Sequence, residues 1–287
     1  MESSLVTTLL LPVALGIVML GLGLSLTLAD FARVIRYPRA VIVGLFTQTV
    51  VLVMGAYLLA RIFALSPELA VGLMLLAASP GGATANIYSH LAHGDVALNI
   101  TLTAINSALA LLTLPLIVSF ALEHFMGQGQ YIPPPTRKII EVAVIIVVPV
   151  IIGMALRAGL PSLAARLEKP IKVFAVLVLA AVILAAIGAE WGKLPTFIAA
   201  VGTACLAFNL LSMGVGYGLP RLLRLPQNQS IAISMEIGIH NGTLAIFIAL
   251  NVLNNATMSI PAAVYSLIMF VTAGIFVTWL NRKRSAH

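Results

Sequence analysis

Two short motifs break up apolar stretches of this chain: SPGGATAN at residues 79–86 and EIGIHNGT at residues 236–243. Each places glycine and polar residues where a continuous membrane-spanning helix would need apolar ones. Pro80 has no backbone N–H and disfavours helical backbone at Ser79. Non-helical backbone at membrane depth survives only against protein or a water-filled cavity. The motifs therefore predict two broken helices, which are typical of secondary transporters built from inverted repeats.

The rest of the sequence indicates that these motifs lie in a membrane protein. Hydrophobic residues make up 61% of the 287 residues and charged residues only 9%, whereas soluble domains carry about 25% charged residues. Fully apolar spans must be helical, because an open sheet leaves backbone groups unpaired in lipid. We therefore predict an all-α integral membrane fold. About nine stretches reach the ~20 residues that a span needs: 5–28, 39–61, 68–92, 95–123, 136–157, 168–189, 195–218, 227–251 and 258–281.

Basic residues give the expected orientation. Most of the 16 Lys and Arg residues fall on one side when the loops are assigned alternately to the two sides of the membrane. The positive-inside rule then predicts a cytoplasmic C-terminus and an outside N-terminus, in a bacterial inner membrane. Because the basic residues are scattered, the net charge of +7 does not indicate a nucleic-acid-binding patch. The opening residues MESS lack the basic region of a signal peptide, so the first apolar stretch is expected to remain as a span.

The breaks fall in the third and eighth predicted spans, which predicts one transmembrane domain over residues 1–287 built from two repeats. Repeat one covers about 1–123 with four spans, and repeat two covers about 136–284 with five. Cys205 is the only cysteine, so neither an intrachain disulfide nor a cysteine metal cluster is expected. The absence of a phosphate-binding loop or nucleophile motif argues against an enzyme and an ATP-driven pump. A monomer is expected, since no coiled-coil or long soluble segment demands a partner.

Glu236 is the acidic residue that lies well inside an apolar run. A charged side chain at the centre of a span costs about 2.5–3.5 kcal/mol on insertion scales. The interiors of the predicted spans contain no Lys or Arg to pair with it. We therefore expect a bound cation or a proton at Glu236; the alternative is a neutral carboxyl group that hydrogen-bonds to backbone exposed by the break.

Asn86 and Asn241 each follow the break in their span. A helix that restarts there presents unpaired N–H groups and the positive end of its dipole, and two such ends suit an anionic substrate. We expect Thr84, Asn86, Asn241 and Gly242 to contact that substrate. In the alternative interpretation, the two asparagines only cap their helices.

Further polar residues lie inside other spans. Asn99, Thr103 and Ser107 are spaced by four and share one helix face, with Asn106 beside them and Gln48 on an earlier span. Their oxygens suit a hard cation, although a polar stripe can also hold helices together. His240 follows Glu236 by four residues, so it would share a face with Glu236 if the helix continued. It could act as a proton relay, donate a hydrogen bond or simply pack.

These motifs, together with HGDVALNITLT at 93–103 and the apolar opening GIVMLGLGLSL at 16–26, resemble the bile acid:sodium symporter family in its bacterial branch. The resemblance covers nearly the whole chain. It implies a panel domain and a core domain in which the two broken helices cross. Many bacterial relatives have ten helices, and this chain is expected to begin at their second and to have the nine-helix form.

The resemblance also implies an organic-anion site in front of the crossing and two sodium sites behind it. The first sodium site corresponds to Ala85, Asn86, Asn99, Thr103 and Glu236. The second corresponds to Gln48, Glu236, the backbone around Ile237 and Ile239, and His240.

Three positions depart from the family pattern. Ala85 lacks the side-chain oxygen of the usual serine, and Asn99 replaces a serine but keeps an oxygen. His240 replaces the expected glutamine; a neutral imidazole is a poor sodium ligand and a protonated one repels sodium. We expect the first site to work. For the second, either coupling uses one sodium ion or His240 makes the site pH-sensitive.

The leading hypothesis is a secondary active transporter that couples sodium to symport of an organic anion, bile-salt-like or a small carboxylate, by alternating access. The alternative is a proton-coupled carrier or antiporter in which Glu236 and His240 titrate, and sodium dependence separates the two. A membrane receptor that binds without transport is a third hypothesis.

Overall fold

The computed structural model describes residues 11–82, 84–127, 136–189 and 194–285. Within these ranges all regular elements are helical, apart from one isolated β-bridge between Gly81 and His240. The prediction of an all-α integral membrane protein is confirmed. The elements of the first half are α1 (Leu11–Ser25), α2 (Leu28–Ala32), η2 (Arg33–Ile35), α3 (Pro38–Phe46), η3 (Thr47–Val51), α4 (Leu52–Ile62), α5 (Pro67–Ala78), α6 (Ala85–Leu91) and α7 (Val96–Met126). Those of the second half are α8 (Thr136–Gly159), α9 (Pro161–Ala189), α10 (Leu194–Leu222), α11 (Gln227–Gly238), α12 (Gly242–Phe247), η5 (Ile248–Val252), η6 (Thr257–Ser259) and α13 (Ile260–Ser285).

Four of the described helices are long and apolar enough to cross a membrane: Pro38–Ile62, Val96–Met126, Val201–Leu222 and Thr257–Lys283. A fifth candidate is the pair Pro12–Ser25 and Leu28–Ile35, which bends by 69°. Each of the nine predicted stretches contains helix, but the count of nine spans stays a prediction. The first stretch was expected to run to residue 28; α1 instead ends at Ser25, before the bend into α2.

Both predicted breaks are present. The third stretch is α5 and α6 with extended backbone at Ser79 between them, and the eighth is α11 and α12 joined by residues 239–241. The two breaks cross and satisfy each other: Gly82 N–H donates to Ile239 O at 2.8 Å, and Asn241 N–H donates to Pro80 O at 2.9 Å. Backbone groups that the breaks remove from the helices are therefore paired inside the protein, as membrane depth requires.

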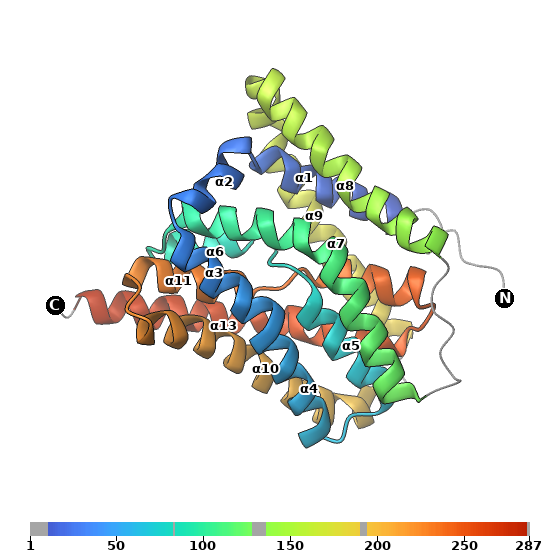
Figure 1. The fold of residues 1–287 in the computed structure, drawn as a ribbon. Helices are drawn as coiled ribbons and strands as arrows, with labels where there is room; N and C mark the ends of the chain where they lie inside the picture. Colours follow the sequence, from blue (N-terminus) through green and yellow to red (C-terminus); the bar gives the residue numbers. More distant parts are fainter. Residues whose placement is uncertain (1–10, 83, 128–135, 190–193, 286–287) are drawn as a thin grey trace.

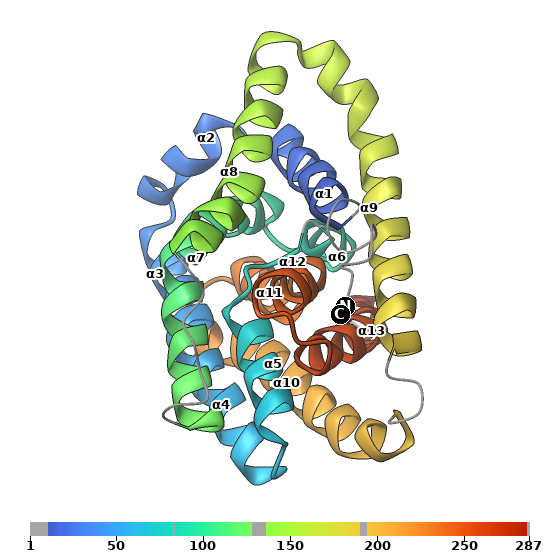
Figure 2. The same cartoon turned by 90° about the vertical axis from the view of Figure 1, so that its right-hand side faces the viewer.

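The helix α11 lies at the centre of the molecule, and its residues from Ser230 to Gly238 are buried. It packs against α10, α7 and α6, with α3 and α13 also in contact. The helices α1, α8 and α9 pack on one another; α1 and α8 lie at the upper side in Figures 1 and 2, and α9 runs down the right-hand side in Figure 2. At the α1–α8 contact, a side chain at Gly23 would overlap the Val150 carbonyl, and one at Gly153 would meet backbone of Leu20. Small residues thus let these two backbones touch, as in other membrane helix pairs.

Candidate functional site

Glu236 is fully buried on α11, directly behind the crossing. Its Oε2 accepts a hydrogen bond from the Thr103 hydroxyl at 2.6 Å, and its Oε1 accepts one from Asn106 Nδ2 at 3.2 Å. The backbone N–H of Gly81 also donates to the carboxylate. All three donors are neutral, and neither ion pair in the described part of the chain includes Glu236. The carboxylate is oriented from three sides, but no positive charge on the described residues balances it.

Gly81 packs directly against this carboxylate. A Cβ atom at this position would overlap the carboxyl carbon and both oxygens of Glu236. Gly81 does not have a positive φ, so the backbone conformation alone does not demand glycine. The residue is small because the first break passes directly over the Glu236 carboxylate.

Several amide oxygens near Glu236 have no hydrogen-bond partner among the described residues. Asn99 Nδ2 donates to Ala232 O at 2.7 Å, and its Oδ1 is buried and unpaired. Asn106 likewise donates through Nδ2 and leaves Oδ1 unpaired. The Thr103 hydroxyl also lies 3.0 Å from Asn99 O, but its single proton can serve only one acceptor at a time. Because the surroundings of Glu236 hold more acceptors than donors can satisfy, they fit a hard cation.

The predicted first sodium site is therefore assembled in part. The structure brings Thr103 to Glu236 and puts Asn99 one turn away on the same helix. Asn106, which the sequence left open between a ligand and a contact between helices, also reaches the carboxylate. Ala85 and Asn86 begin α6, where Ala85 is fully buried and Asn86 Oδ1 is unpaired; no hydrogen bond between described residues joins either to Glu236.

Two side chains of the predicted second sodium site, Gln48 and His240, contact the same backbone carbonyl. Ser79 O accepts from Gln48 Nε2 at 3.1 Å and lies 3.1 Å from His240 Nδ1. A proton on Nδ1 makes this contact a hydrogen bond and leaves Nε2, which has no partner among the described residues, as an acceptor. The imidazole stacks on Phe208 with ring centroids 5.7 Å apart and meets Tyr265 edge-on at 5.4 Å. Rings therefore surround much of His240, where a sodium ion would need oxygens.

One of the backbone carbonyls expected in that second site already accepts a hydrogen bond. Ile239 O accepts the Gly82 N–H, and Ile237 is a fully buried residue of α11. The helix α11 ends at Gly238, so Glu236 and His240 do not share one continuous helix face. No hydrogen bond between described residues joins the two side chains, which weakens the interpretation of a direct proton relay.

The two helix starts expected to face an anion differ. Asn241 Oδ1 accepts the Leu244 N–H at 3.0 Å and so caps α12. Thr84 is the N-cap of α6 without a side-chain cap bond, and Asn86 sits in the first helical turn rather than at the cap. Gly242 packs against the Ser266 hydroxyl, and its N–H donates to His240 O at 3.0 Å. The capping interpretation thus fits Asn241 but not Asn86.

Comparison with known proteins identifies the family of this chain. Residues 12–194 match the sodium bile acid symporter family. This chain belongs to the sodium bile acid symporter family. It is 28% identical to the rice protein "Probable sodium/metabolite cotransporter BASS2, chloroplastic" over 97% of this chain. It is 24% identical to the Bacillus subtilis "Uncharacterized sodium-dependent transporter YocS" over 94% of this chain, and 28% identical to the human "Sodium/bile acid cotransporter 4" over 92%.

The chain spans 65% of the rice relative's length, 82% of the Bacillus protein and 61% of the human one. The family is one of transporters, so the expectation that the chain is not an enzyme is confirmed. The resemblance to this family expected from the sequence is confirmed with it.

Some residues of this family member were missed in the sequence. Asn209 Nδ2 and the Tyr265 hydroxyl both donate to Gly238 O, at 3.0 and 2.9 Å, where α11 ends. Both are polar residues inside apolar stretches, which was an available signal. Nothing in one sequence, however, indicated that helices α10 and α13 meet at this carbonyl. The close approach of Gly81 to Glu236 could not be predicted either, because the role of glycine in breaking the helix already accounted for Gly81 in the sequence.

Proposed function

We propose that this protein is a secondary active transporter that couples sodium entry to symport of an organic anion. The observation that carries the proposal is the Glu236 carboxylate, buried and held by three neutral donors. A buried charge without a partner is costly. A cation drawn from solution provides that partner, and the relatives named as sodium cotransporters make sodium the first candidate.

The geometry suggests how the ion would act. Glu236 belongs to α11, its donors Thr103 and Asn106 belong to α7, and Gly81 belongs to the first break. A sodium ion shared by the carboxylate and the unpaired amide oxygens ties these three segments together. The helices α6 and α12 begin directly after the two breaks. Binding of the ion thus stabilises the arrangement that presents the two helix starts to the substrate.

The substrate class follows from the charge at those helix starts. Thr84, Asn86, Asn241 and Gly242 lie at the starts of α6 and α12, and the positive end of a helix dipole favours a carboxylate or a sulfonate. A bile-salt-like anion and a small carboxylate both carry such a group. Of the four, Asn86 is the best candidate for direct contact, because its Oδ1 is unpaired among the described residues and it does not cap its helix.

We further propose that His240 holds no ion. Its Nδ1 faces Ser79 O, and aromatic rings of Phe208 and Tyr265 pack against the imidazole. The position that the resemblance assigns to a second sodium is therefore filled by a side chain that binds sodium poorly. We expect the transporter to be a monomer in a bacterial inner membrane, with its N-terminus outside and its C-terminus in the cytoplasm.

Thermal unfolding in detergent tests the proposal without knowledge of the substrate. Sodium chloride is compared with choline chloride at equal pH and ionic strength. A ligand that binds only the folded state adds about 2.7 kcal/mol at one hundred times its Kd. We expect a sodium-specific rise of the midpoint that disappears in Glu236→Ala. The matched control is Glu123→Gln, which removes an exposed carboxylate from the same helix α7 that supplies Thr103.

Two other outcomes point elsewhere. A midpoint that ignores sodium but moves with pH in a Glu236-dependent way supports the proton-coupled alternative. Sodium-dependent binding of the anion without its accumulation in proteoliposomes supports a receptor.

A further inference from the structure

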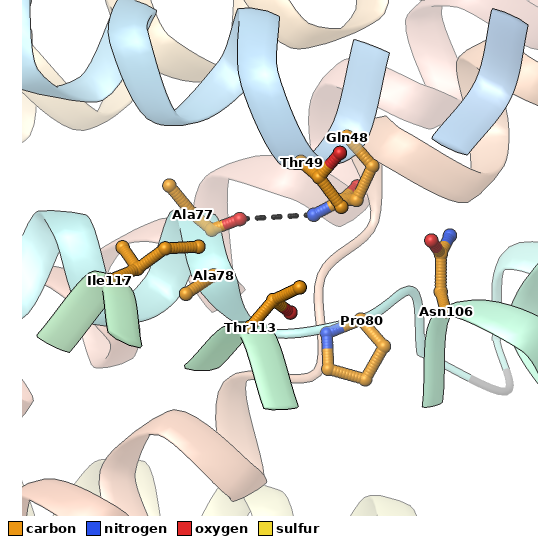
Figure 3. Close-up of a pocket in the computed structure, with 8 residues that line it drawn as sticks. All are labelled: Gln48, Thr49, Ala77, Ala78, Pro80, Asn106, Thr113 and Ile117. Carbon is orange, nitrogen blue, oxygen red and sulfur yellow. Dashed lines mark hydrogen bonds between the residues drawn. The ribbon is translucent and has the colours of Figure 1, made fainter. Parts of the chain in front are cut away.

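Two hollows in the described part of the chain differ in what they can hold. The smaller lies where η3, α5 and α7 meet (Figure 3) and has a volume of about 10 Å³, enough for one water molecule at most. The larger is an open groove of about 620 Å³ whose lining residues all belong to α13, between Phe270 and Arg282. Its volume falls in the range of about 300–1,000 Å³ that is typical of sites for small organic ligands.

The apolar part of this groove faces away from the protein. Val271 and Ile275 line it, are 63% and 64% exposed, and lie one helical turn apart on the same face of α13. Gly274 lies beside them, and a Cβ atom added there would have no neighbour within 4 Å beyond the adjacent residues and the helix backbone. Because α13 is part of a candidate membrane span, the medium at this face is lipid rather than water.

Cations and an aromatic ring lie at the C-terminal end of the groove. Arg282 lines the groove there and is exposed. Trp279 lines it too, and Nζ of Lys283 lies 4.3 Å from the centre of a Trp279 ring. Neither ion pair in the described part of the chain includes Arg282 or Lys283. The groove therefore ends at two positive charges that no described carboxylate neutralises, beside a tryptophan of the kind enriched at membrane surfaces.

The groove has the depth of one lipid leaflet. Phe270 and Arg282 are twelve residues apart, which corresponds to about 18 Å along a helix. Half of the hydrocarbon core of a bilayer measures about 15 Å. Arg282 lies next to the end of the candidate span Thr257–Lys283. An acyl chain in the groove would therefore reach towards the middle of the bilayer while its headgroup lies level with the two cations.

The groove is also connected to the first broken span. Tyr88 of α6 stacks on Phe270 with ring centroids 6.2 Å apart, and its hydroxyl donates to Phe270 O at 3.2 Å. Near the other end of the groove, Asn281 Nδ2 donates to Leu91 O at 3.1 Å. A molecule that holds this stretch of α13 in place thus also supports α6.

We propose that this groove binds an anionic phospholipid, with an acyl chain along Val271, Gly274 and Ile275 and the phosphate at Arg282 and Lys283. A guanidinium group binds phosphate through two parallel hydrogen bonds. Interfacial cations favour an anionic headgroup over a zwitterionic one. On the predicted orientation, the lipid comes from the cytoplasmic leaflet. The site is separate from the proposed sodium and substrate sites and does not depend on them.

Quenching of Trp279 fluorescence by brominated lipids tests the site. The chain has two tryptophans. Trp191 lies outside the described residues, and Trp191→Phe in the full chain leaves Trp279 as the only reporter. Brominated phosphatidylglycerol, which is anionic, and brominated phosphatidylcholine, which is zwitterionic, each compete with unbrominated phosphatidylcholine in vesicles, which gives their relative affinity. Since each interfacial Lys or Arg raises the affinity for anionic lipid about fivefold, we expect phosphatidylglycerol to be preferred at least about fivefold.

Two variants in this background separate the charge from the shape of the groove. Arg282→Gln should lower the preference about fivefold. Gly274→Leu should lower it to a similar extent without changing any charge, because its side chain fills the groove. The matched controls are Arg36→Gln, at an exposed arginine outside the groove, and Gly214→Leu, at a glycine of α10 that also has free space around it. Both controls should keep the full preference, and unfolding midpoints verify that every variant is folded.

Three results would overturn the inference. Equal affinity for the two lipids means that the groove is ordinary lipid-facing surface. A preference that persists in Gly274→Leu, or that falls equally in Arg36→Gln, means that the overall positive charge attracts the lipid and not this groove. Disulfide cross-linking of Thr278→Cys chains in vesicles, with Trp279 protected from both lipids, assigns the groove to a second copy of the chain; the native Cys205 is buried and does not interfere.

Discussion

Gly81→Ala is the sharpest test of the idea that the first break positions Glu236. The added methyl group would overlap the carboxyl carbon and both oxygens of Glu236. The carboxylate must then move away from Thr103 and Asn106, or the break must shift. Overpacking of this kind costs about 1–3 kcal/mol, and hydrogen bonds to charged groups are each worth about 1.5–3 kcal/mol. We therefore expect the free energy of unfolding in choline chloride to fall by about 1–3 kcal/mol.

The sodium effect should fall as well. At a sodium concentration one hundred times the Kd of the unmodified protein, binding adds about 2.7 kcal/mol. A tenfold weaker site would leave about 1.4 kcal/mol of that stabilisation. We expect Gly81→Ala to lose at least half of the sodium-dependent stabilisation, measured as the difference between unfolding midpoints in sodium and choline chloride.

Gly82→Ala is the matched control. It changes the neighbouring glycine of the same break, where the nearest atom to the new methyl group is His240 O at 3.3 Å. Neither glycine has a positive φ, so left-handed backbone opposes neither substitution, and the two differ in what the methyl group meets. If Gly81→Ala keeps the full sodium-dependent stabilisation, or if Gly82→Ala loses as much, the reasoning is wrong.

Three further predictions follow from single contacts. Thr103→Val should weaken sodium binding at least tenfold, because it removes a donor to Glu236, whereas Thr101→Val, equally buried on α7 but bonded only to its own helix, should not; sodium titrations of unfolding midpoints compare them. Asn241→Ala should lower stability by about 1 kcal/mol, because it removes the cap of α12, and by equal amounts in sodium and choline; a loss confined to sodium would instead make Asn241 part of an ion site. His240→Gln should not weaken the sodium dependence of uptake into proteoliposomes, and a clear weakening would return His240 to the ion-binding residues.

Much of the fold could be predicted from composition and from the two motifs. Apolar spans in lipid have to be helices, and the clustering of Pro80 with glycines and polar residues disfavours an unbroken one, so broken helices at 79–86 and 236–243 could be predicted. The end of α1 at Ser25 was not, because Leu26, Thr27 and Leu28 are apolar or neutral and give no signal for a 69° bend. Length and hydropathy show that a segment enters the membrane but not where it turns.

The candidate site was predicted by residue type but not by pairing. Glu236 was identified because an isolated carboxylate in an apolar run is costly. Its partner Thr103 came through the family resemblance, while Asn106 could only be left open, since a polar residue on a helix face looks the same whether it binds an ion or another helix. The spacing of Glu236 and His240 suggested a common face, and it failed because α11 ends at Gly238, between them.

The crossing itself indicates which parts of the molecule can move. Two backbone hydrogen bonds join the breaks, from Gly82 N–H to Ile239 O and from Asn241 N–H to Pro80 O. These backbone groups have no alternative partner within a helix. Separating the breaks at membrane depth would leave four backbone groups unpaired, at several kcal/mol each. The side chains of Gln48 and His240 meet at Ser79 O in the same place and add to this cost. We therefore expect alternating access to preserve the crossing as a rigid unit and to proceed by movement of α1, α8 and α9, which pack mainly on one another, against it.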